Sequence, residues 1–170
     1  MNDSHSNSGR NGDPEDWIDL LVLPDAVEVH LRIGPRMPLG LRVHSGERDR
    51  LAKRLMRSSG GRILEGGRCC AFGVDAAKQA QRLAETLGAA MRQLASKPIS
   101  QRHVERALAI SSAERLRWGK DGRLPQAGSA EIRRGGPVTL WTYSPVIVER
   151  LARHPEIIAS WRERDRLALG

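Results

Sequence analysis

The sequence predicts an α+β fold in two parts. A small N-terminal α/β layer, an antiparallel hairpin plus two helices, precedes two short helices, a second hairpin and a C-terminal helix. Three observations predict it. Apolar residues alternate with polar ones from Val27 to Ile33, which is typical of a half-buried strand. Apolar residues recur at spacings of three and four over 76–94, which indicates an amphipathic helix. Ser111 and Glu114 form a capping box that marks a helix start.

The 170 residues divide into three stretches. Residues 1–16 are polar and show no periodicity, so we expect a disordered tail without a signal peptide. Pro98 disfavours a helical residue before it and marks a boundary. We therefore expect an α/β domain at 17–97 and a second domain at 98–170. No apolar run approaches the about 20 residues of a membrane span, and we expect a cytoplasmic protein with no membrane partner.

The elements of the first domain follow from its turns and apolar spacing. The strand at 27–33 is expected to pair as a hairpin with 39–43, around the Gly-Pro turn at 34–38. This pairing would place Glu28 near His44 and His30 near Arg42. The other expected elements are a short apolar run at 18–23, a helix at 47–57, strands at 63–64 and 69–74, and a long helix capped by Asp75.

The cysteines and histidines give no pattern of a metal site. Cys69 and Cys70 are adjacent, so they point to opposite faces of a strand and cannot form an unstrained disulfide. They lack the Cys-x2-Cys spacing of zinc sites, and the five histidines are scattered. We expect apolar packing of both cysteines in a reduced protein, with no metal and no cofactor.

The charge is unevenly distributed and favours a polyanionic partner. Residues 1–25 carry one arginine and six acidic residues, residues 26–97 carry 14 basic and 6 acidic residues, and residues 98–170 carry 13 and 8. A basic surface gains affinity for nucleic acid from counterion release. The chain contains no nucleotide-binding loop, metalloprotease motif or nucleophile-elbow motif, so we do not expect an enzyme.

The C-terminal domain begins with two short helices. The first is expected at 100–109, burying Val104 and Leu108, and Ile110 fills the turn after it. The second, at 112–121, ends by Gly122. A two-stranded wing is expected at 129–143 around Gly135-Gly136, and helices follow Pro145 and Pro155. The tryptophans Trp118, Trp141 and Trp161 fall at core spacings.

Residues 98–153 resemble the winged helix-turn-helix of MerR-type regulators and phage excisionases. The resemblance lies in the stretch LAISSAERLRWGKDGRLP at 108–125. It shares the serine-containing turn, an arginine followed by tryptophan in the second helix, Asp-Gly, Leu-Pro and then a wing. The chain departs from the family in placing Arg115 at a usually apolar position and Leu116 at an arginine position.

The resemblance implies that helix 112–121 enters the DNA major groove. Ser112, Arg115 and Arg117 would then read bases, with Arg115 the best candidate for a bidentate contact to guanine. Lys120 and Arg123 after the helix, and the wing-tip pair at 133–134, would contact phosphates. The amides following Ser111 would offer a further phosphate site. The implied DNA-binding residues are Ser111, Ser112, Arg115, Arg117, Lys120, Arg123, Arg133 and Arg134.

Two functions are favoured at this point, and an enzyme with an unrecognised site is a third that no motif supports. The first is a double-stranded-DNA-binding transcriptional regulator or recombination accessory factor, in which 17–97 mediates homo-oligomerisation or contacts a partner protein. The alternative is a small non-catalytic subunit of a nucleoprotein complex that binds RNA or protein. The larger excess of basic residues in 26–97 favours the alternative.

Overall fold

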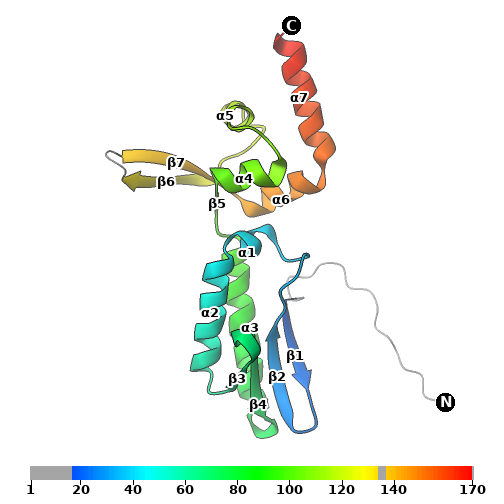
Figure 1. The fold of residues 1–170 in the computed structure, drawn as a ribbon, viewed down its shortest axis with the longest axis vertical. Coiled ribbons are helices and arrows are strands. Elements are labelled where there is room, and N and C mark those ends of the chain that lie inside the picture. Colours follow the sequence, from blue (N-terminus) through cyan, green and yellow to red (C-terminus); the bar gives the residue numbers. More distant parts are fainter. Residues whose placement is uncertain (1–16, 134–136, 170) are drawn as a thin grey trace, which may run out of the picture. The chain divides into compact units, whose positions relative to one another are not determined.

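A computed structural model describes residues 17–133 and 137–169, and their fold is of the predicted α+β class. The chain forms two compact units (Figure 1), each with its own antiparallel sheet. The described part of the first comprises 17–35 and 49–92, and that of the second comprises 36–48, 93–133 and 137–169. The tail expected at 1–16 lies outside the described residues. Among the described helices, none combines the length and the apolar character needed to cross a membrane.

The first unit contains a four-stranded antiparallel sheet. Its strands are β1 (Ile18–Val22), β2 (Ala26–Leu31), β3 (Arg62–Leu64) and β4 (Cys69–Gly73), in the order β1-β2-β4-β3. The register places Ile18 opposite Leu31, and His30 opposite Cys69. The apolar run at 18–23 therefore supplies the hairpin partner of β2.

Two helices, α2 (Ser45–Ser58) and α3 (Ala77–Ala95), lie beside this sheet (Figure 1). The apolar stripe predicted along α3 is confirmed from residue 80 onward, because its members at 80, 83, 87, 91 and 94 are all at most 5% exposed, whereas Ala76 is half-buried in the turn before the helix. From the sheet, β2 contributes the buried residues Val27, Val29 and Leu31. Asp75 does not cap α3 directly but lies in a 3₁₀ turn, Val74–Ala76, that leads into it.

The predicted strand at 39–43 is wrong. These residues form the short helix α1 (Leu39–Val43) in the second unit. Leu39 and Leu41 are both buried, as a strand with alternating apolar residues would also place them, so burial alone does not distinguish the helix from a strand. Gly40 lies so close to the Ala95 backbone that an added Cβ would be 2.0 Å from the Ala95 carbonyl oxygen. Tertiary packing therefore decides the conformation of a segment too short for its period to be decisive.

The expected pairs across that hairpin are wrong for the same reason. β2 pairs with β1 and β4, not with 39–43. Glu28 and His30 consequently belong to the first unit, whereas Arg42 and His44 belong to the second.

The second unit follows the predicted order of elements closely. It contains β5 (Ile99–Ser100), α4 (Gln101–Leu108), α5 (Ser112–Lys120), β6 (Gly128–Arg133), β7 (Pro137–Tyr143), α6 (Pro145–Arg153) and α7 (Pro155–Leu169). A three-stranded antiparallel sheet has the order β5-β7-β6. The predicted hairpin tip at 135–136 lies outside the described residues.

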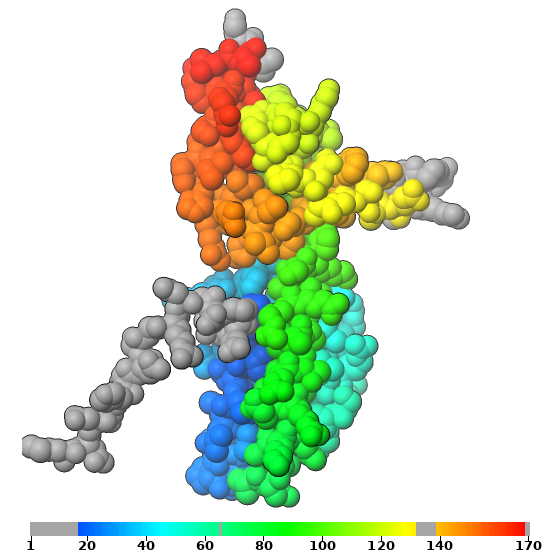
Figure 2. Space-filling view, turned by 180° about the vertical axis from the view of Figure 1, so that it is seen from behind, coloured from blue at the N-terminus to red at the C-terminus, as the bar shows by residue number. Residues whose placement is uncertain are grey.

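The core of this unit lies between its helices and the base of the hairpin. Trp118 is fully buried and meets Trp161 edge-on, with ring centroids 5.1 Å apart. The prediction of a core position for Trp141 is wrong, because this side chain is 42% exposed. Tyr143 has the same parity on β7 and is buried at the base of the hairpin. Trp141 lies two residues farther along an arm that extends past the helices (Figures 1 and 2).

Candidate functional site

The junction between α4 and α5 has the geometry that the sequence predicts. Ser111 Oγ accepts a hydrogen bond from the Glu114 amide at 3.1 Å, and the Ser111 amide donates to Glu114 Oε2 at 2.7 Å. This reciprocal pair is a capping box. Ala109 ends α4 in the left-handed conformation at φ 51°, and Ile110 is buried behind the turn. The Glu114 carboxylate therefore already occupies the helix N-terminus that could have bound phosphate.

The inner side of α5 is held by a buried arginine. Arg115 is 5% exposed and donates to Glu105 Oε1 on α4 at 2.7 Å and to the Tyr143 hydroxyl on β7 at 3.2 Å. Ser112 Oγ also donates to Glu105 Oε1, at 2.9 Å. A guanidinium enclosed in this way offers no donors to a base edge. Arg115, implied by the resemblance as the best reader of guanine, has a structural role in this conformation.

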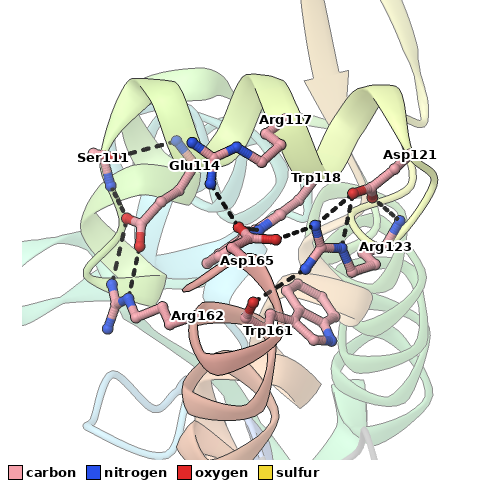
Figure 3. Close-up of polar contacts among 9 residues, drawn as sticks. All are labelled: Ser111, Glu114, Arg117, Trp118, Asp121, Arg123, Trp161, Arg162 and Asp165. Atoms are coloured by element: carbon pink, nitrogen blue, oxygen red, sulfur yellow. Dashed lines mark hydrogen bonds and ion pairs between the residues drawn. The ribbon is translucent and has the colours of Figure 1, made fainter. Parts of the chain in front are cut away.

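A second polar network joins α5 to α7 (Figure 3). Asp165 on α7 accepts hydrogen bonds from Trp118 Nε1 at 2.8 Å, from Arg117 at 2.8 Å and from Arg123 at 2.6 Å. Hydrogen bonds from Arg123, then Trp118, lower the pKa of Asp165 to about 2. This network fixes the distance and rotation of α5 relative to α7.

Glu114 adds an ion pair to the same junction. Its Oε1 accepts from Arg162 Nε on α7 at 2.6 Å. This hydrogen bond, followed by those from Ser111, lowers the pKa of Glu114 to about 2, against an opposing contribution from burial. One carboxylate therefore caps α5 and binds it to α7.

Arg123, a predicted phosphate contact, is also engaged inside the unit. Its side chain is 19% exposed and pairs with Asp121 and Asp165. It donates to the Trp161 carbonyl at 3.2 Å and lies over the rings of Trp118 and Trp161, 5.7 and 6.0 Å from their centroids. These contacts hold the Arg123 guanidinium against the rings of Trp118 and Trp161.

The opposite side of α5 is exposed, and we call it the outer face of α5. Its members recur at helical spacing, and they are Ala113, Leu116, Arg117 and Lys120, with Ser112 at the edge nearest Glu105. Leu116 is 58% exposed. The Arg117 side chain is 47% exposed despite its pair with Asp165. Lys120 has no carboxylate partner within residues 17–133 and 137–169.

A groove runs beside the base of the β6–β7 arm, and we call it the hairpin groove. It has a volume of about 610 Å³ and is lined by His44, Pro98, Ser100, Gln101, Arg102, His103, Ala130, Leu140, Trp141 and Thr142. Burial, together with nearby His44 and Arg106, lowers the pKa of His103. The groove thus combines an exposed indole with the Arg102 cation. Sequence reasoning missed it because it assigned Trp141 to the core.

The structure separates the residues implied by the resemblance into three groups. Ser112, Arg117 and Lys120 lie on the outer face of α5, beside the Ser111 cap. Arg115 and Arg123 are held inside the unit. The Arg133 side chain and the whole of Arg134 lie outside the described residues.

Comparisons with known proteins add no family assignment. No protein-family model, no curated protein and no solved structure matches this chain.

Proposed function

We propose that the chain binds double-stranded DNA, as a transcriptional regulator or a recombination accessory factor. In this proposal α4, α5 and the β6–β7 arm act as a winged helix-turn-helix. The helix predicted at 112–121 enters the major groove, and the wing at 129–143 contacts phosphates. One observation carries the proposal: α5 is locked on its inner side by Arg115 and Trp118, while a whole helical face remains exposed.

The chemistry of the outer face of α5 suits a base edge. The major groove is about 12 Å wide and admits one helix. Lys120 can donate to guanine or to phosphate, and Ser112 can donate to a base once it leaves Glu105. Leu116 offers an apolar contact for the thymine methyl group. DNA contact would thus account for a leucine side chain that is 58% exposed among polar residues.

Arg117 and Arg115 differ in how easily each can leave its carboxylate partner for DNA, because the Arg117–Asp165 pair is more exposed than the Arg115–Glu105 pair. Arg117 is half exposed, and Asp165 keeps Trp118 and Arg123 as donors, so Arg117 can exchange Asp165 for a phosphate at little cost. Breaking a buried pair costs about 3–5 kcal/mol. Arg115 is therefore not expected to leave Glu105 for DNA.

A fluorescence-anisotropy titration with a labelled random-sequence duplex tests the proposal. We expect micromolar or tighter binding that weakens steeply with salt. Lys120→Glu and Leu116→Glu should each weaken binding about tenfold or more, because each places a carboxylate on the proposed contact face, where it repels the DNA phosphates.

Arg150→Glu is the matched control, because it makes the same charge change as Lys120→Glu at an exposed site on α6. Equal effects of the two changes would mean that binding reflects net charge alone. Unchanged binding by both α5 variants, with folding intact by circular dichroism, would overturn the assignment.

A second candidate function is a subunit of a nucleoprotein complex that binds single-stranded RNA. The observation that favours it is the exposed Trp141 beside Arg102 in the hairpin groove. Stacking of a base on an aromatic ring is worth about 1–3 kcal/mol. Under this alternative Trp141→Ala weakens single-stranded RNA binding about tenfold or more, while Lys120→Glu has little effect. The opposite result with duplex DNA selects the first function.

A further inference from the structure

The first unit contains a cluster of three metal-ligating side chains that the proposed function does not use. Strand alternation places Val27, Val29 and Leu31 on the buried face of β2, and so places Glu28 and His30 on the opposite face. Cys69 on β4 lies directly across from His30 in the antiparallel register. The Cys70 thiol is on the other face, where it contacts the Met56 carbonyl on α2.

The three donor atoms lie close together. His30 Nε2 is 2.7 Å from Glu28 Oε2 and 3.4 Å from Cys69 Sγ, and Sγ is 3.9 Å from Oε2. Tetrahedral zinc, with bonds of about 2.0–2.3 Å, separates its ligand atoms by about 3.3–3.7 Å. Two of the three separations are within about 0.2 Å of that range. The hydrogen-bonded Nε2–Oε2 pair needs to open by about 0.6 Å.

We propose that Glu28, His30 and Cys69 bind one Zn²⁺ ion, with water as the fourth ligand. The sulfur, nitrogen and oxygen donors suit zinc, whereas calcium and magnesium prefer oxygen alone. Cys69 is 7% exposed, and the side chains of Glu28 and His30 are 19% and 33% exposed. Solvent therefore reaches the site beside Glu28 and His30, and we expect the bound ion to exchange with zinc in solution.

Binding follows a simple proton balance. The Cys69 thiol loses its proton to solvent and coordinates as thiolate, while Glu28 coordinates as carboxylate. His30 coordinates through the Nε2 lone pair, so its proton resides on Nδ1. Asp19 lies opposite His30 on β1 but pairs with Arg32, which leaves the site with three protein ligands. The proposed zinc site lies entirely within the first unit, so it does not depend on the proposed DNA binding.

Cobalt(II) and zinc titrations of the chelator-treated 170-residue chain test this site. We expect one ion per chain, and we expect cobalt to produce a thiolate-to-metal charge-transfer band with the visible spectrum of a tetrahedral site. Cys69→Ser should abolish the charge-transfer band. It should also lower zinc affinity by more than the about 10–100-fold that loss of an outer-shell partner costs.

Cys70→Ser is the matched control, since it changes the neighbouring thiol on the opposite face. It should retain the charge-transfer band and the stoichiometry. His30→Gln gives a second ligand variant, with folding followed by circular dichroism, and it should weaken zinc binding while leaving a thiol in place. Three results would each overturn the proposal: no binding by the wild type, equal zinc affinity in the wild type and Cys69→Ser, or loss of the band in Cys70→Ser alone.

Discussion

Asp165 on α7 accepts a hydrogen bond of 2.8 Å from the indole nitrogen of Trp118 on α5, across 47 residues of sequence. Trp118 is fully buried and stacks edge-on against Trp161, so this bond orients the aromatic pair at the centre of the second unit. The same carboxylate accepts from Arg117 and Arg123. The position of α5 depends on α7 through this one side chain.

Replacement of Asp165 should destabilise the second unit. We expect Asp165→Ala to lower the melting temperature clearly, because the buried Trp118 Nε1 and Arg117 lose their acceptor, and Arg123 keeps only Asp121 and the Trp161 carbonyl. Glu163→Ala is the control, since Glu163 pairs with Arg166 at an exposed site on the same helix. Differential scanning calorimetry should show a much smaller change for the control. Equal shifts would contradict a central role for Asp165.

The low pKa of Glu114 predicts a loss of stability in acid. Its pKa falls from an ordinary 4.5 to about 2 in the folded chain. The ionised form is therefore stabilising above pH about 4.5, and this contribution disappears as the pH falls toward 2. Urea unfolding between pH 6 and 2.5 should show a weaker pH dependence for Glu114→Gln than for the wild type. Parallel curves would contradict the assigned ion pair with Arg162.

Removal of Glu105 should leave a buried charge without its partner. Arg115 keeps the Tyr143 hydroxyl as its remaining acceptor in Glu105→Ala, so we expect a loss of about 3–5 kcal/mol in unfolding free energy. Glu131→Ala on β6 changes an exposed glutamate and should stay within about 0.5 kcal/mol of the wild type. Chemical denaturation measures both. A small effect of Glu105→Ala would mean that Arg115 is solvated.

The turn between α4 and α5 offers a stabilising substitution. Ala109 has φ 51° and ψ 48°, a left-handed conformation that favours glycine. Ala109→Gly should raise the unfolding free energy by about 0.5–1 kcal/mol, because relief of the Cβ strain exceeds the entropy cost of glycine. Destabilisation by this change would show that the alanine methyl contributes packing that outweighs its strain.

Local patterns predicted the second unit well. The capping box at Ser111 and Glu114 and the prolines that open α6 and α7 act through neighbouring backbone, so sequence alone identifies them. The apolar stripe of α3 was predicted in a similar way, from the local spacing of apolar residues. The segment at 39–43 failed because its conformation depends on distant partners, namely Ala95 and Glu149.

The candidate site was less predictable than the fold. Helical spacing gives the two sides of α5 but not the elements that pack against them. The burial of Arg115 depends on Glu105 of α4, and the position of Arg123, just after α5, depends on Asp165 of α7. The departure at Arg115 from the family pattern was the available signal, because that position is usually apolar. The cluster at Glu28, His30 and Cys69 depends on strand register, which the wrong hairpin concealed.

An NMR titration tests the central claim most directly. Unlabelled duplex DNA is added to the ¹⁵N-labelled 170-residue chain, and amide shifts are followed residue by residue. We expect the largest shifts on α5 from Ser112 to Lys120 and on the β6–β7 arm, with little change along α2 and α3. Shifts concentrated on α2 and α3, with α5 unaffected at saturating DNA, would contradict DNA binding through α5.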